Sequence, residues 1–162
     1  MTVHALAQTN VSRLKYPLDS EELRPFVDAE ASVYSDAEEA GGFVWRHTSG
    51  DCEDRSGLRV FNDDFLVVNV SVWQDLQALM AFMYRGPHRD VMARRHEFFE
   101  RVDEAMSAMW WIPAGHRPSL KEAEQRLIHL REHGPTPYAF TLRMTFPAGT
   151  AQGGSGSAEA VS

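Results

Sequence analysis

The chain has 162 residues, and its 23 acidic residues outnumber its 16 lysines and arginines, which gives a formal net charge of −7. An acidic chain has no general attraction for phosphate backbones or anionic lipid, and no stretch approaches the about 18 consecutive apolar residues that span a bilayer. The first residues lack the basic and long apolar regions of a secretory signal, and the single cysteine, Cys52, cannot form an intrachain disulfide. We therefore expect one soluble cytoplasmic protein that binds neither nucleic acid nor membrane.

The composition along the chain predicts one folded domain, residues 1–146, followed by a tail. Residues 147–162 consist mostly of glycine, serine, alanine and threonine, which have little apolar surface to bury, so we expect this tail to be disordered. Residues 48–57 combine glycines with acidic residues between two apolar runs and form a second weakly ordered candidate. No internal repeat or linker divides the rest.

The first half of the chain predicts a strand, a helix and two further strands. Residues 5–11 alternate as a strand does, and a helix follows with Asp19 as its N-cap and Gly41-Gly42 as its stop. Residues 43–48 form the second predicted strand. Residues 65–72 are so rich in β-branched and apolar side chains that we expect a central strand buried on both faces.

The second half predicts three helices and two strands. Leu76 begins an amphipathic helix that Gly86-Pro87 ends, and a second helix runs over residues 88–102. Residues 106–112 form a short strand. A capping box at Ser119 then opens a helix that Gly134-Pro135 closes, and the last alternating segment predicts a strand over 138–146.

This order of elements predicts an α+β fold with a four- or five-stranded, largely antiparallel sheet and helices on one face. Such a sheet has a second face, and the apolar character of the strands indicates that this face is also covered. We expect a second copy of the chain to cover it, in a homodimer. The residues that suggest this cover are Val68, Val70, Val72, Trp110, Ile112, Phe140 and Leu142.

Charged side chains interrupt two predicted apolar helix faces. His88 and Arg95 fall within the apolar stripe of the 88–102 helix, and Glu30 falls within that of the first helix. A buried arginine requires a carboxylate or another acceptor, so Arg95 either forms a structural ion pair, with Glu30 as a candidate partner, or lines a pocket. An unpaired Glu30 in a dry pocket would have a raised pKa and act as a base. The helix N-terminus favours the neutral form of His88.

Polar and aromatic residues also interrupt the central strand. Asn69, Ser71 and Trp73 alternate onto one sheet face, and a buried asparagine amide needs partners that either a ligand or the core supplies. Trp110 and Trp111 present one indole to each face of their strand. Either one indole fills a pocket and the other an interface between subunits, or both belong to the core.

The segment from His129 to His133 matches the H-x-x-E-H pattern of inverted zinc peptidases. That site needs a distant third carboxylate, and the only acidic residue after His133 is Glu159 in the tail. We therefore expect a solvated helix face and no metal site. Motifs for phosphate loops, dinucleotide binding, serine hydrolases and thiol redox sites are absent from the sequence.

The run from Asn69 to Leu79, followed by Arg85-Gly-Pro-His88, resembles the strand, helix and Pro-His segment of the antibiotic-biosynthesis monooxygenase type of dimeric α+β barrel. The core from Ala5 to Phe146 is more similar to an uncharacterised bacterial family within that group. The motifs that carry this resemblance are residues 42–46, 69–73, 110–118 and 134–141.

The resemblance implies a ferredoxin-like subunit that pairs sheet against sheet in a homodimer and keeps a pocket between its own helices and sheet. In the cofactor-independent monooxygenases of this group, an asparagine and a tryptophan four residues later bind and activate an electron-rich aromatic substrate, whose anion passes an electron to dioxygen. Asn69 and Trp73 match that spacing. We assign Asn69, Trp73, His88 and Arg95 to catalysis, and the expected substrate-binding residues are Glu30, Trp45, Tyr84, Trp111 and His116.

The sequence thus favours a small-molecule enzyme of secondary metabolism that needs no cofactor. Its reaction would be oxygenation or cyclisation of an aromatic or polyketide-like substrate. A haem enzyme of the same barrel is one alternative, with His88 as axial ligand and His116 in reserve. A non-catalytic binding protein for an apolar metabolite is another, because this fold serves many functions.

Overall fold

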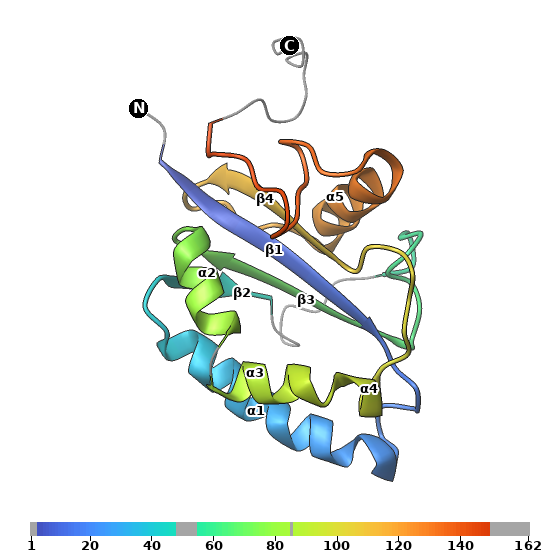
Figure 1. The fold of residues 1–162 in the computed structure, drawn as a ribbon. Coiled ribbons are helices and arrows are strands. Elements are labelled where there is room, and N and C mark those ends of the chain that lie inside the picture. Colours follow the sequence, from blue (N-terminus) through green and yellow to red (C-terminus); the bar gives the residue numbers. More distant parts are fainter. Residues whose placement is uncertain (1–2, 48–54, 85, 150–162) are drawn as a thin grey trace.

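The computed structural model describes residues 3–47, 55–84 and 86–149, without the side chains of residues 86–88. Its centre is a four-stranded antiparallel sheet with the strand order β2-β3-β1-β4. The predicted α+β class and antiparallel sheet are confirmed (Figure 1). The strands are β1 (His4–Arg13), β2 (Phe43–Arg46), β3 (Leu66–Trp73) and β4 (Ser107–Pro113).

Helices lie on both sides of this sheet, whereas the sequence predicted them on one side (Figure 1). On one side, Ala37 of α1 and Leu79 of α2 pack with Trp73 of β3. On the other side, Leu127 of α5 packs with Trp110 of β4. The helical segments are η1 (Glu21–Leu23), α1 (Arg24–Glu39), α2 (Leu76–Met83), α3 (Gly86–Ala93), α4 (Arg95–Phe98) and α5 (Leu120–His133).

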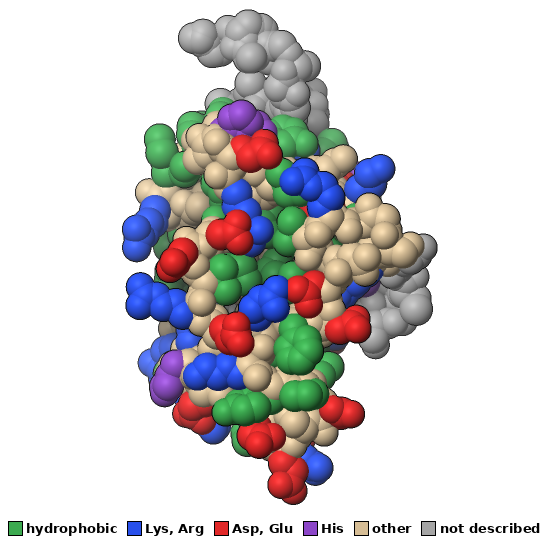
Figure 2. All heavy atoms as spheres, turned by 90° about the vertical axis from the view of Figure 1, so that its right-hand side faces the viewer, with side chains coloured by type: hydrophobic (Ala, Val, Ile, Leu, Met, Phe, Trp, Pro, Cys, Tyr) green, Lys and Arg blue, Asp and Glu red, His purple; other side chains and the backbone are tan. Residues whose placement is uncertain are grey.

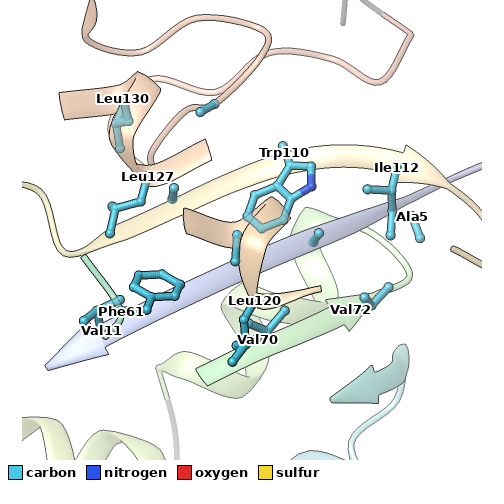
Figure 3. Packing of buried hydrophobic residues seen from close by; sticks show 14 of the residues in the cluster. Ala5, Val11, Phe61, Val70, Val72, Trp110, Ile112, Leu120, Leu127 and Leu130 are labelled. Carbon is cyan, nitrogen blue, oxygen red and sulfur yellow. The ribbon is translucent and has the colours of Figure 1, made fainter. Parts of the chain in front are cut away.

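The sheet face that was expected to meet a second copy is covered by the chain itself. Val70 and Trp110 on this face are at most 1% exposed, because Leu127 of α5 and Phe61, in the loop before β3, pack over them (Figure 3). The apolar character of the strands therefore reflects two covers within one chain, and it gives no reason for a dimer on this face. Self-association stays a prediction that rests on the resemblance alone.

Capping chemistry explains where two helices begin. The Ser119 hydroxyl accepts a hydrogen bond from the Glu122 amide at 3.0 Å, which confirms Ser119 as the predicted N-cap of α5, whereas the Glu122 carboxylate contacts Trp110 and His116. The predicted N-cap at Asp19 is wrong, since α1 begins only at Arg24, after the short turn η1. Pro25 occupies its first turn, where the missing amide hydrogen costs no helical hydrogen bond.

The predicted helix over 88–102 is broken into α3 and α4, with non-helical backbone at Arg94. After α4, the chain leaves the helix at Phe98 and runs beside the end of β1. The Lys15 amide donates to the Phe98 carbonyl at 2.9 Å, and the Glu100 amide donates to the Arg13 carbonyl at 2.8 Å. These long-range bonds replace the helical ones that the local pattern predicted.

The predicted strand over 138–146 is also wrong. Its Phe140 exchanges two backbone hydrogen bonds with Met109 of β4, each 2.9 Å long, and the chain then turns at Thr141. The single bridge buries Phe140 completely, which accounts for the alternating pattern in the sequence.

Charges of both signs are interspersed over the face of the molecule that Figure 2 shows, so the net negative charge is not gathered into one patch there. Among the helices that the structure describes, none is both long and apolar enough to cross a membrane. The disorder predicted for 150–162 and for 48–54 falls outside the described residues.

Candidate functional site

Three adjoining cavities meet at Tyr34 of α1 and Asn69 of β3. Two of them lie on the side of the sheet that α1 and α2 cover, which we call the pocket face and define by Gln8, Asn69, Ser71 and Trp73. The third also reaches Leu120 of α5. The cavity above these four residues is small, with a volume of about 70 Å³, and it adjoins a wider one of about 480 Å³ at Tyr34 and Asn69. Apolar walls with a few polar groups are typical of the lining of a small-molecule site.

Strand alternation places Asn69, Ser71 and Trp73 on the pocket face, as the sequence predicted. Trp73 is 1% exposed, and its indole stacks on Phe82 with ring centroids 5.0 Å apart. Its Nε1 donates a hydrogen bond to the Ser71 hydroxyl at 3.0 Å. The indole is therefore a fixed apolar wall whose polar atom is already bonded.

Tyr34 is the centre of the polar part of the site. Its hydroxyl oxygen lies 2.9 Å from Glu30 Oε2, one helical turn away, and 2.8 Å from Asn69 Oδ1. A phenol has one hydrogen to donate, so it cannot serve both oxygens at once. Either the Glu30 carboxyl is protonated and donates to Tyr34, or the Asn69 amide turns its nitrogen toward the hydroxyl. The two arrangements differ in whether the Glu30 carboxyl carries a proton.

Burial sets the electrostatics of this group. It raises the pKa of Glu30, which the hydrogen bond from Tyr34 and the charge of Arg46 counteract. Burial also raises the pKa of Tyr34 far above its ordinary value, and the charge of Glu30 adds to the effect. Tyr34 therefore stays a neutral phenol, and the Glu30 carboxyl is the member of the pair that loses its proton first as the pH rises.

Arg46 completes the site from strand β2. Its guanidinium lies over the Tyr34 ring, 4.0 Å from the centroid, and its Nε donates to Glu38 at 3.0 Å. Trp45 was expected to contact substrate, but it packs on the α5 side of the sheet, with the Arg117 guanidinium 5.8 Å from its ring centroid. An irregularity in β2 between Phe43 and Trp45 shifts the register, and Arg46 lines the cavity.

Arg95 does not belong to this site. The break at Arg94 changes the helical phase, so Arg95 is exposed, and its predicted place in an apolar stripe is wrong. Glu30 is bonded to Tyr34, which corrects its expected pairing with Arg95. Tyr34 stands four residues after Glu30 in the same apolar stripe, and side chains at this spacing are neighbours on a helix. This spacing predicts the Glu30–Tyr34 pair, whereas opposite charge predicts only a pair of Glu30 with an arginine.

Two further expected substrate contacts lie outside the cavities. Tyr84 follows α2 and is 59% exposed. His116 lies beyond the end of β4, where its Nε2 is 2.6 Å from Glu122 Oε1. Neither residue lines the three cavities, so the structure gives these two expectations no support, and they stay predictions.

The tryptophan pair is divided between the two faces, as predicted. The Trp110 indole is buried on the α5 side and donates to Glu122 at 2.9 Å. Trp111 lies on the opposite side, where its Nε1 donates to the Phe146 carbonyl at 2.7 Å and the C-terminal segment packs against it. Trp111 therefore does not line the three cavities. The backbone of His88 lies in α3, and its side chain falls outside the described part of the structure.

The histidines of α5 form a separate cluster. The rings of His129 and His133 are 4.4 Å apart, and the Tyr138 ring lies 4.6 Å from that of His129. His129 is half-buried, whereas the sequence predicted a solvated helix face. Burial and the neighbouring His133 lower its pKa. The part of the chain that the structure describes contains no group of three or more potential metal ligands.

The comparisons with other proteins concern most of the chain. The family model described as "Domain of unknown function (DUF3291)" matches residues 5–155. No protein with curated function matches the sequence. Among solved structures, a conserved protein from Methanosarcina mazei Go1 has 9% identity and a TM-score of 0.48, over 68% of this chain and 92% of that one.

Two further solved structures carry descriptions of an activity. SnoaB from Streptomyces nogalater, described as a cofactor-independent oxygenase, has 16% identity and a TM-score of 0.42, over 72% of this chain and 96% of that one. A putative antibiotic biosynthesis monooxygenase from Chloroflexus aurantiacus J-10-fl has 12% identity and a TM-score of 0.41, over 71% and 97% of the two chains.

Proposed function

We propose that this chain, which belongs to the DUF3291 family of unknown function, is a small-molecule enzyme that oxygenates an aromatic or polyketide-like substrate without a cofactor. One observation carries the proposal. The Asn69 amide, the Tyr34 hydroxyl and the Trp73 indole line a single cavity between helix and sheet. This places hydrogen-bonding groups for an oxyanion beside an apolar wall that would support a flat ring.

The chemistry that suits this cavity begins with an electron-rich anion. The anion of anthrone passes one electron to dioxygen, and the two radicals join through a new carbon–oxygen bond. Loss of water from the resulting peroxide leaves a carbonyl, so anthrone and dioxygen become anthraquinone and water. The protein's contribution would be to hold the oxyanion against Tyr34 and Asn69 and to exclude water with Trp73 and Phe82.

A haem enzyme needs an axial ligand at the cavity. Of the two ligands that the sequence suggested, His116 is held by Glu122 outside the cavity, and the side chain of His88 is not described. The proposed oxygenation needs neither of them.

Oxygen uptake by the purified protein with anthrone tests the proposal. We expect consumption above the rate in buffer, with anthraquinone as the product. Asn69→Ala should lower the rate, because the oxyanion loses one of its two hydrogen-bonding side chains. Asn62→Ala is the matched control, since this asparagine is exposed and lines none of the three cavities. Binding of anthrone without turnover would assign the cavity to a binding protein, and a ring-closed product from a polyketide chain would assign it to a cyclase.

A further inference from the structure

The contacts of Tyr34 offer a path for the proton of a ligand hydroxyl that binds beside it. We infer that Glu30 and Tyr34 together accept a proton from the ligand, and that the ligand is a weakly acidic phenol or enol. Tyr34 would contact the ligand oxygen, and Glu30 would act through Tyr34 as a positioning residue and final acceptor. The inference rests on the proposed function for its site, but it does not require a reaction with dioxygen.

The placement of the two side chains supports this relay. Tyr34 lines all three cavities and Glu30 lines two of them. The Tyr34 oxygen stands between Glu30 Oε2 at 2.9 Å and the Asn69 side chain at 2.8 Å. A ligand hydroxyl that reaches Tyr34 from the Asn69 side therefore meets a chain of hydrogen bonds that ends at a carboxylate.

The proton step balances without another reactant. The ligand O–H bond breaks as its proton passes to the Tyr34 oxygen, and the Tyr34 proton passes at the same time to Glu30 Oε2. The ligand becomes an oxyanion and Glu30 becomes a neutral acid, so the charge of the cavity is unchanged. Moving an existing charge inside a buried site avoids the cost of creating a new one there.

The surroundings of Glu30 include positive charge that can stabilise an anion either on Glu30 or on the ligand. Tyr34 on its own helix donates to it, and Arg46 of β2 and the following His47 line the same cavity. The opposite wall contributes Arg55 and Asp64. The residues that α3 contributes to the cavity lining, Val91 and Met92, are apolar. The Arg46 guanidinium over the Tyr34 ring keeps positive charge beside both possible sites of the anion.

A phenol that changes colour on ionisation tests the inference directly. 4-Nitrophenol absorbs in the visible range only as its anion, and it does not undergo the oxygenation proposed for anthrone. At a pH below its pKa in water, we expect the wild-type protein to bind it and to produce the phenolate band. Glu30→Gln and Tyr34→Phe preserve the shape of the site but break the relay, so both should bind the neutral phenol and lose the band.

Glu39→Gln is the matched control, because Glu39 is an exposed carboxylate on the same helix. It should keep the wild-type spectrum, and circular dichroism should show that each variant is folded. The inference is overturned if wild type binds the neutral phenol or no phenol, or if Glu30→Gln keeps the full phenolate band. A phenolate band without oxygen uptake from anthrone would reject the oxygenase function and retain the relay, and uptake without the band would do the reverse.

Discussion

The hydroxyl of Tyr34 lies 2.8 Å from the side-chain oxygen of Asn69, and this contact joins α1 to an inner strand of the sheet. Asn69 was already a candidate from its position in an apolar strand. Tyr34 provides a hydrogen-bonding partner for that half-buried amide, and Glu30 on the other side of the hydroxyl adds a proton acceptor. The polar centre of the cavity is thus built from a helix and a strand that are distant in sequence.

Removal of the Tyr34 hydroxyl should separate activity from stability. Tyr34→Phe keeps the ring but loses the group that contacts the ligand oxygen, so we expect oxygen uptake to fall by about 10²-fold. The free energy of unfolding should change by only about 1 kcal/mol, because one hydrogen-bonding group is lost. Enzyme assays and urea unfolding measure the two effects. Tyr84→Phe removes an exposed hydroxyl and should change neither quantity. Equal activity in both variants would contradict the role of Tyr34.

The Trp73 indole should contribute mainly through packing. It is 1% exposed and contacts Phe43 and Phe82, so Trp73→Ala leaves a large hole between α2 and the sheet. We expect a loss of about 3–5 kcal/mol in the free energy of unfolding, measured in urea. Met80→Ala on the exposed side of α2 is the control and should cost far less. A loss near that of the control would mean that the indole is not a fixed wall of the cavity.

The α5 face gives a prediction about assembly. Leu127 is 0% exposed against the sheet, so Leu127→Ala should lower the free energy of unfolding by about 2–5 kcal/mol. It should leave the sedimentation coefficient of the folded protein unchanged, because this face is covered within one chain. Leu18→Ala, at an exposed position, is the control for the stability effect. Dissociation of an oligomer by Leu127→Ala would show that the face is an interface between copies.

Stability should depend on pH through Glu30. Its pKa is raised above the ordinary 4.5 by burial, so the folded state holds the proton more tightly than the unfolded state does. The contribution of Glu30 to stability is therefore complete below 4.5 and is lost as the pH rises through its folded-state value. Urea unfolding at a series of pH values should show a smaller decline for Glu30→Gln than for wild type. Glu39→Gln should keep the wild-type slope, and identical slopes for all three proteins would contradict the raised pKa.

Local patterns in the sequence predicted the parts of the fold that depend on local chemistry. The alternation of β3 placed Asn69 and Trp73 on one face, and the capping box at Ser119 marked the start of α5. These features follow from backbone geometry and nearest neighbours, and they held in the structure. The face on which α5 packs did not follow from such patterns, since a helix pattern reports an apolar side without its partner.

The errors about the site share one physical cause, which is competition from contacts distant in sequence. Pairing with the end of β1 ends the helical segment at Phe98, short of the predicted residue 102, and the irregular register of β2 exchanges Trp45 for Arg46. The role of Tyr34 depends on Asn69, which only the folded chain brings near. A search for hydrogen-bonding pairs one helical turn apart would have singled out Glu30 with Tyr34.

The initial rate of dioxygen consumption with anthrone tests the central claim most directly, because it reports on the cavity around Asn69 and Tyr34 as a site of chemistry. Wild-type protein and Asn62→Ala should consume dioxygen in equal amount to the anthraquinone formed, well above the rate in buffer. Asn69→Ala should fall toward the buffer rate while remaining folded. A wild-type rate equal to that of buffer, or an Asn69→Ala rate equal to that of wild type, would contradict the account.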